Sequence, residues 1–367
     1  MRTFVAVAVA ALGILLPAPA ALADQGSVTQ YRPTTSVQFR PGDGDKLVVE
    51  TTLDLAAGER RHLHGRLEVV SSFDKIVALN AVLKCFGTGS GPALVGTAST
   101  SSRNHEGRDA AYPDGQGHLT LVVDLLFAAP EAGAYRCGLY AKTSAASTDP
   151  YNLAVVTGGK SWLEISDTDQ AGAQWWENPE CSSTGSSPTC TYIGKGQPGS
   201  AWIFYQDGTS VIKWPHVAEA TQVEAIANVT ATTCPVATAS CDRVAAADRE
   251  PRRTGSRSVV DFRLDVIQLD RAGSHTCVTT SAAHTSVITD DAHHFTTRLT
   301  IPEVPISSSC GGLFLLRVYA EHVSGSPVKI DGRQGGTSLT NGILLNRWKR
   351  AAAEPGRLPA MVRPGQG

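Results

Sequence analysis

Short segments in which apolar residues alternate with polar ones recur along most of the chain. The clearest are KLVVETTLDL (46–55), HGRLEVV (64–70), HLTLVVDLLF (118–127), SAWIFY (200–205), VVDFRLDVIQL (259–269) and LFLLRVYAEH (313–322). Alternation with period two places every second side chain on one face of a strand. Clusters of Gly, Pro, Asp and Ser between the segments indicate turns. The pattern predicts an all-β protein of short antiparallel strands.

The two halves of the chain carry similar segments in the same order. The first half has TSVQFRP (35–41), VVET (48–51), HGRLEVV (64–70), HLTL (118–121) and GLYAKTS (138–144), and the second has TSVIKWP (209–215), QVEA (222–225), DFRLDVI (261–267), HFTT (294–297) and RVYAEHVS (317–324). The offset between partners changes where one half has a longer loop, and sheets tolerate insertions there. This internal repeat predicts a duplicated fold, and it favours a strand over a helix at 217–229.

Two domains therefore follow from the repeat and from the length of the chain. We expect one antiparallel β-sandwich at 28–166 and a second at 200–345. The Ser-, Gly- and Pro-rich segment 167–199 is typical of a connector. Residues 346–367 are expected to form a disordered tail.

The N-terminus has the composition of a secretory signal peptide. Arg2 is followed by an apolar run, and Ala21-Leu22-Ala23 supplies small residues for cleavage. We interpret residues 1–23 as this signal and expect a secreted protein, extracellular or at the cell surface. Arg is much more frequent than Lys, which is typical of a high-GC bacterial genome.

Charge and hydropathy exclude several classes of partner. The formal net charge is −2, so nothing favours nucleic acid or an anionic membrane surface. No later apolar run is long enough to cross a bilayer. No phosphate-binding glycine loop or complete nucleophile elbow occurs, so we expect neither a cofactor nor catalytic residues.

Eight cysteines in an exported chain favour disulfides, and none of their spacings is that of a zinc site. The repeat places Cys85 opposite Cys277 and Cys137 near Cys310, which predicts one bond in each domain: Cys85–Cys137 and Cys277–Cys310. The remaining residues would close the local loops Cys181–Cys190 and Cys234–Cys241. Similarity between RAGSHTC (271–277) and EAGAYRC (131–137) leaves an alternative open, in which Cys234 pairs with Cys277 and Cys241 with Cys310.

Two short motifs are candidate sites. His62 and His64 are two residues apart on an expected strand, so both rings can reach one metal ion; two polar side chains on a hairpin are the ordinary interpretation. Trp175 and Trp176, followed by Glu177, are costly to leave in water. They either fill the gap between the domains or form a contact surface for a sugar or a protein.

Residues 131–137, EAGAYRC, resemble the F strand of immunoglobulin-like domains, where an Asp-x-Gly/Ala-x-Tyr-x-Cys run carries the tyrosine corner and the second core cysteine. Glu131, Gly133, Tyr135 and Cys137 occupy the matching places, and Cys85 can supply the first cysteine. The resemblance implies an immunoglobulin-like sandwich. No Trp lies between the two cysteines, which argues against an antibody-type domain.

Many strands without a catalytic constellation favour a non-catalytic binding or structural protein. It would contact another extracellular protein or a surface glycan, for instance as a subunit of an extracellular assembly. A carbohydrate-binding lectin is the first alternative. A secreted hydrolase with unidentified carboxylates or a metal site is the second.

Overall fold

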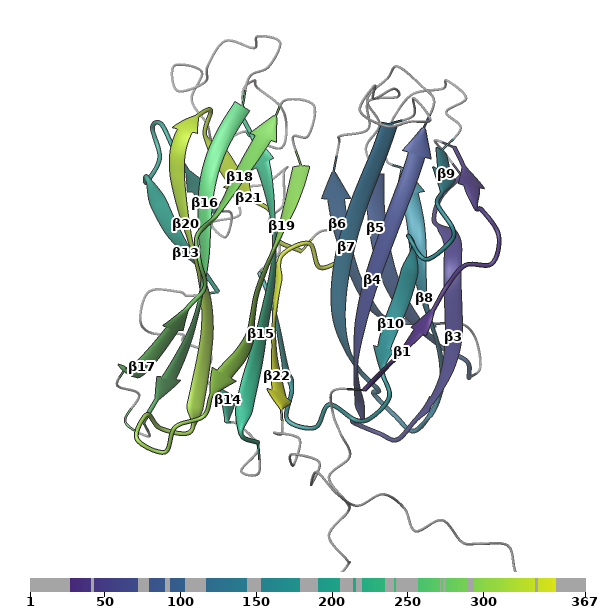
Figure 1. Ribbon diagram of the computed structural model, residues 1–367, viewed down its shortest axis with the longest axis horizontal. Coiled ribbons are helices and arrows are strands. Elements are labelled where there is room, and N and C mark those ends of the chain that lie inside the picture. The colour runs from purple at the N-terminus through teal and green to yellow at the C-terminus, as the bar shows by residue number, and fades with distance from the viewer. Residues whose placement is uncertain are drawn as a thin grey trace, which may run out of the picture.

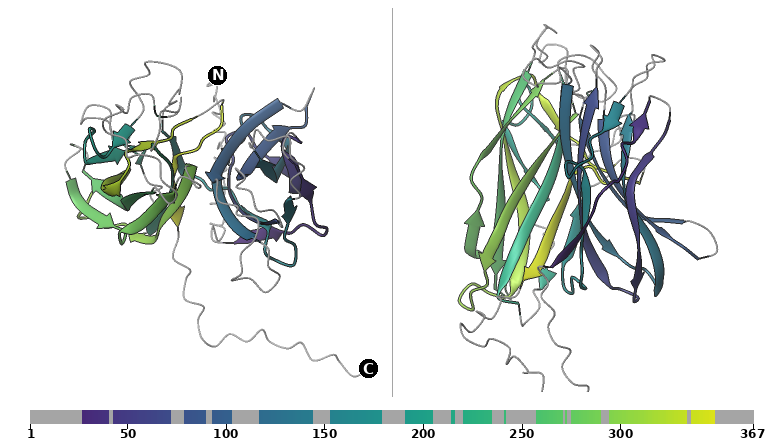
Figure 2. Two further views of the ribbon diagram at one scale, coloured as in Figure 1. Left: turned by 90° about the horizontal axis from the view of Figure 1, so that it is seen from above. Right: turned by 45° about the vertical axis from the view of Figure 1, so that its right-hand side comes forward.

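The computed structural model describes residues 27–40, 43–71, 79–89, 93–102, 117–143, 153–178, 191–204, 214–215, 220–234, 241, 257–270, 272, 275–289, 294–333 and 336–347. The expected signal peptide, residues 348–367 of the expected tail, and both Cys181 and Cys190 lie outside these ranges. The first two residues assigned to the tail, 346 and 347, instead end a strand, Asn341–Arg347. The described part is all-β, as the alternation predicted, and forms two sandwiches that lie side by side (Figures 1 and 2).

The first sandwich consists of β1 (Val28–Tyr31), β2 (Gln38–Phe39), β3 (Lys46–Leu55), β4 (Arg60–Ser71), β5 (Leu79–Gly87), β6 (Ala93–Ser102), β7 (Gly117–Ala128), β8 (Gly133–Thr143), β9 (Leu153–Val155) and β10 (Trp162–Ser166). One sheet has the order β1-β10-β4-β9-β2, and β7 also pairs with β4. The other sheet has the order β3-β8-β5-β6. Leu, Val and Phe side chains from the two inner faces form a single core.

The second sandwich consists of β11 (Gln174–Glu177), β12 (Thr191–Ile193), β13 (Ser200–Ile203), β14 (Trp214–Pro215), β15 (Gln222–Thr233), β16 (Arg257–Leu269), β17 (His275–Thr280), β18 (His284–Thr289), β19 (His294–Pro305), β20 (Leu313–Gly325), β21 (Val328–Ile330) and β22 (Asn341–Arg347). Its first sheet has the order β11-β22-β15-β21-β12, and β19 also pairs with β15. Its second sheet has the order β13-β20-β16-β17, with β14 on β20 and β18 on β16. A separate core lies between these sheets.

Both strand orders are those of a jelly roll, a double-sheet fold built from two Greek keys. An immunoglobulin constant-type domain instead pairs its strands as ABED and CFG, so that expectation holds only for the sandwich architecture. One local feature of the resemblance is present: the Tyr135 hydroxyl donates to the backbone oxygen of Glu131 at 2.7 Å. This contact fixes the entry into β8 and does not specify the order of the strands.

The matching strand orders also test the sequence repeat. HLTL and HFTT lie on β7 and β19, and GLYAKTS and RVYAEHVS lie on β8 and β20, which occupy equivalent places. HGRLEVV lies on β4 and DFRLDVI on β16. These two strands do not occupy equivalent places, because the equivalent of β4 in the second domain is β15. Alternation makes any strand resemble any other, so short matches can align the wrong strands. Residues 222–233 do form a strand, as expected.

The segment expected to be a connector contributes to the second domain. Residues 174–177 form β11, which pairs with β22, and residues 191–193 form β12, which pairs with β21. The second sandwich therefore begins before residue 200. The Ser-, Gly- and Pro-rich composition around these short strands indicated a connector. Their pairing partners lie more than a hundred residues later, so the local sequence could not predict the pairing.

Three of the expected disulfides are present: Cys85–Cys137, Cys234–Cys241 and Cys277–Cys310. The alternative pairing of Cys234 with Cys277 is therefore wrong. Cys85 and Cys137 face each other in register on β5 and β8, so the first bond ties two central strands of one sheet together.

Candidate functional site at the junction of the two domains

The two domains meet mainly through the outer face of the sheet that contains β4 and β7 and the outer face of the sheet that contains β15 and β19. The edge strand β6 adds a contact, in which the Ser99 N–H donates to the Ser338 oxygen at 2.9 Å. On β4 and β7, Leu63, Val123 and Leu125 point into the first core, so alternation turns His62, His64 and Asp124 outward. On β15, Ala225, Ala227 and Val229 fill the second core, which turns Ile226 and Asn228 outward. Each of these strands therefore turns one face into a core and its other face towards the junction.

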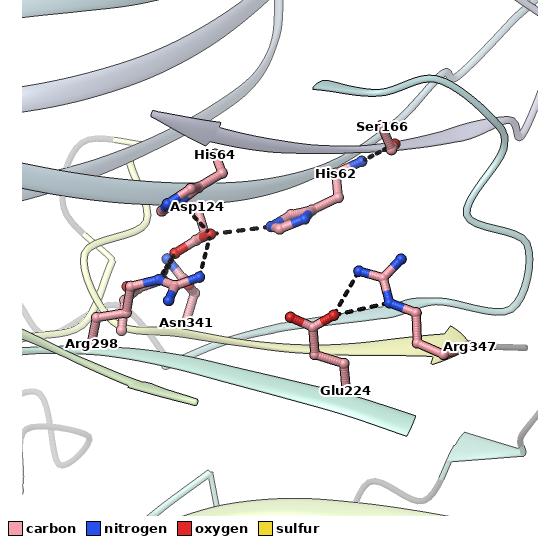
Figure 3. A network of polar contacts seen from close by, with 9 residues as sticks. His62, His64, Asp124, Ser166, Glu224, Arg298, Asn341 and Arg347 are labelled. Atoms are coloured by element: carbon pink, nitrogen blue, oxygen red, sulfur yellow. Dashed lines mark hydrogen bonds and ion pairs between the residues drawn. The ribbon is translucent and has the colours of Figure 1, made fainter. Parts of the chain in front are cut away.

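Asp124 lies at the centre of this junction and is fully buried. Arg298 of β19 donates from Nε to Oδ2 at 2.7 Å and from Nη2 to Oδ1 at 3.2 Å. From the first domain, His62 Nε2 lies 3.1 Å and His64 Nδ1 2.9 Å from Oδ1. Asn228 donates to Oδ2 at 3.3 Å. Figure 3 shows side chains of both domains converging on this one carboxylate.

The surroundings keep this carboxylate ionised. Burial by itself would raise the pKa of Asp124, but the charges of His64 and Arg298 and the hydrogen bond of His62 outweigh it and hold the pKa well below its usual value. The pKa of Arg298 is raised in turn: burial opposes the charge, and Asp124 more than compensates. The two charges therefore stabilise one another across the junction.

A second ion pair and a small apolar cluster complete the contact. Arg347 of β22 donates to Glu224 of β15 at 2.6 and 2.9 Å and reaches Gln170, which follows β10, at 3.3 Å. The apolar cluster joins Leu126 of β7 to side chains of the second domain and of the segment before it. Its other members are Ala173, Ile226, Ile343 and Leu345, and Trp175 packs against it. Polar groups thus occupy the centre of the junction, with apolar contact beside them.

His62 and His64 do share a face, with ring centroids 6.5 Å apart, as their spacing predicted. Both rings face Asp124, whose two oxygens also accept from Arg298, so a guanidinium supplies the positive charge that a metal would bring. In the part of the chain that the structure describes, no group of three or more His, Cys, Asp or Glu side chains is arranged to hold a metal ion. The geometry favours an ion cluster here, and metal binding by these histidines stays a prediction.

Trp175 and Trp176 lie half-buried on β11. Trp175 packs against the first core and the junction cluster, and Trp176 packs against the second core. The Trp175 indole donates to Glu177 at 2.9 Å. This placement supports the packing interpretation, and a binding role for the three residues stays a prediction.

A second buried acid, Asp331, follows β21 and lies beside Thr232 of β15. Asp331 accepts from Thr232, lies 3.4 Å from His294 Nδ1 and forms a 2.9 Å ion pair with the buried Lys329. Thr232, His294 and Asp331 do not form a catalytic triad, because Thr232 and Asp331 both meet the same ring nitrogen and Thr232 is buried. The cluster has the properties of a structural network.

Acid titration should report on Asp331. Burial by itself would raise its pKa, but the hydrogen bond and charge of His294, with Lys329 and Thr232, lower it to about 2. A carboxylate with a depressed pKa stabilises the fold above its ordinary pKa of 3.8, and this is lost as the pH falls towards 2. We expect wild-type stability to fall by roughly 2 kcal/mol more across this window than that of Asp331→Asn.

Urea unfolding at closely spaced pH values measures this difference. Asp54→Asn, a change at an exposed position of β3, is the matched control and should keep the wild-type slope. Parallel curves for wild type and Asp331→Asn would contradict the expectation.

Comparison with known proteins gives no family. No family model matches the chain, and no curated protein matches it. Among solved structures, VP2 of infectious bursal disease virus (D431N mutant, T=1 particles) is 11% identical over 87% of this chain and 68% of that chain, with a TM-score of 0.25. The CBM22-1–CBM22-2 tandem domain of Paenibacillus barcinonensis Xyn10C is 10% identical over 86% and 99%, with a TM-score of 0.21. The stem and receptor-binding domain of spike protein P1 of bacteriophage PM2 is 10% identical over 89% and 99%, with a TM-score of 0.20.

Proposed function

We propose that this chain is a secreted, non-catalytic binding or structural protein whose two jelly rolls act as one rigid body. The observation that carries the rigid-body part of the proposal is the fully buried Asp124, which accepts from His62 of one domain and from Arg298 and Asn228 of the other. Domains in one chain move relative to each other unless their interface is substantial. A buried charge that needs partners from both domains strongly disfavours their separation, because separation removes part of its hydrogen-bond and ion-pair partners.

Export is supported by the disulfides, which persist in oxidising compartments, and by the signal-like residues 1–23. The equivalent strand orders support an origin of the two domains by duplication. No helix of the described part is long and apolar enough to cross a membrane. A rigid pair of sandwiches suits a subunit of an extracellular or cell-surface assembly, because each outward sheet keeps a fixed position relative to the other.

Binding without turnover is the testable content of this proposal. Purified mature chain should co-sediment with the insoluble cell-envelope fraction of the producing organism, and the supernatant should gain no reducing ends or free amino groups over many hours. Serum albumin serves as the non-binding control. Release of soluble sugar or peptide in proportion to added protein would overturn the non-catalytic assignment and favour the hydrolase alternative. Absence of co-sedimentation would count against a surface-binding role.

A further inference from the structure

The outward sheet of the second domain carries an ordered row of rings and guanidinium groups. β13, β20 and β16 lie on the side of this domain away from the first domain (Figure 1). Trp202 and Tyr319 are cross-strand partners with ring centroids 4.8 Å apart. The Arg317 guanidinium lies 3.7 Å from the centre of the Trp202 ring, and that of Arg263 lies 4.8 Å from the Tyr319 ring. Stacking of this kind fixes both the rings and the cations.

The two arginines of this row differ in their polar partners. Arg317 donates to Asp265 at 3.0 Å. Arg263 is exposed, and its contact in the described part of the chain is the stack on Tyr319, with no carboxylate at ion-pair distance. Glu321, two residues beyond Tyr319 on β20, is likewise exposed and makes no ion pair within the described ranges. Among the residues that the structure describes, Tyr319 is therefore flanked by a donor and an acceptor that form no ion pair.

The equivalent sheet of the first domain shows that this is not a general property of the fold. Tyr140 lies on β8, the strand equivalent to β20, and has Lys84 5.6 Å from its ring. Lys84, however, is paired with Asp45, and Arg136 lies 3.4 Å from Glu50. Lys84 over Tyr140 and Arg136 over Phe86 are thus each paired with a carboxylate. Of the two stacked arginines in the second domain, by contrast, only Arg317 forms an ion pair among the described residues.

We propose that the outer face of β13, β20 and β16 binds a neutral polysaccharide, which would give the proposed binding function its ligand class. A pyranose ring presents C–H groups to an aromatic face, and its hydroxyl groups both donate and accept. The Tyr319 ring already contacts Arg263 and Trp202, so one sugar can lie against its exposed part while accepting from Arg263 and donating to Glu321. An acidic polymer would satisfy Arg263 but would meet Glu321 and Asp261, which is opposite it in register, as like charges.

Affinity electrophoresis of the full mature chain tests this proposal. Native gels containing soluble xylan, glucomannan or mixed-linkage β-glucan supply the neutral ligands, and polygalacturonate supplies the acidic one. At least one neutral polymer should retard the protein, and Arg263→Ala and Tyr319→Ala should each weaken that retardation about tenfold or more. Lys84→Ala and Tyr140→Ala, which change the corresponding cation and ring of the first domain, should leave it intact.

Each other outcome counts against the site. Retardation by polygalacturonate alone would show an anion site, and retardation that survives both second-domain changes would place binding elsewhere. Because Arg263 is exposed, its replacement leaves the core intact, which unchanged thermal unfolding verifies. If the chain binds the cell envelope but no neutral polymer, the ligand class is wrong and the proposed function stands.

Discussion

Replacement of Asp124 by alanine is expected to lower the free energy of unfolding by about 3–5 kcal/mol. The change leaves Arg298 facing a cavity without its carboxylate, and it removes the acceptor of His62 and Asn228 at the same time. Removing one partner of a buried ion pair costs more than the pair contributes, because the remaining charge stays desolvated. Urea-induced unfolding followed by tryptophan fluorescence measures the loss.

A cycle of variants separates the charge from the packing. Arg298→Leu in the Asp124→Ala background removes the orphaned cation and should restore part of the lost stability, so the two changes are not additive. Arg66→Ala, which removes a contact with Glu68 in the same first-domain sheet, is a control that should cost about 1 kcal/mol or less. A loss below about 1 kcal/mol for Asp124→Ala would show that the junction does not depend on this carboxylate.

The same variant tests whether the junction keeps the domains together. Small-angle X-ray scattering should give wild type a single compact profile and give Asp124→Ala a larger radius of gyration, because the apolar part of the contact is small. Unchanged scattering together with lowered stability would assign Asp124 to domain stability alone and would remove the main support for a rigid two-domain body.

Alternation along the chain was sufficient to predict the all-β class, because each strand shows the period that one buried face imposes. It could not predict the order of the strands, since pairing depends on partners far apart in sequence. The clearest example is β4, whose sequence most resembles β16 and whose structural equivalent is β15. Two strands with the same buried face look alike wherever they stand in a sheet.

The candidate site was predictable only in part. The spacing of His62 and His64 correctly placed both rings on one face, but Arg298, their neighbour across the junction, comes from a strand of the other domain. Asp124 was overlooked although a signal was present. It is the one charged residue within the apolar run LTLVVDLLF, and a carboxylate in such a strand implies a buried partner of opposite charge.

Loss of the Cys85–Cys137 bond is the other change with a large expected effect. Its cysteines are separated by 52 positions and are fully buried. Closing a loop of this size lowers the conformational entropy of the unfolded chain, which stabilises the fold by about 4 kcal/mol. The Cys85→Ala/Cys137→Ala variant should be destabilised by about that amount under non-reducing conditions, with an added cost where the core loses contacts.

The Cys234–Cys241 bond is the internal control for this expectation. Its cysteines are also buried, but they are separated by only 7 positions, so the same reasoning gives about 2–3 kcal/mol for Cys234→Ala/Cys241→Ala. Chemical unfolding of both double variants beside wild type measures the order of the two losses. A larger loss for the short loop would contradict the entropic account and would show that the bond between β5 and β8 adds little to strands that already pair in register.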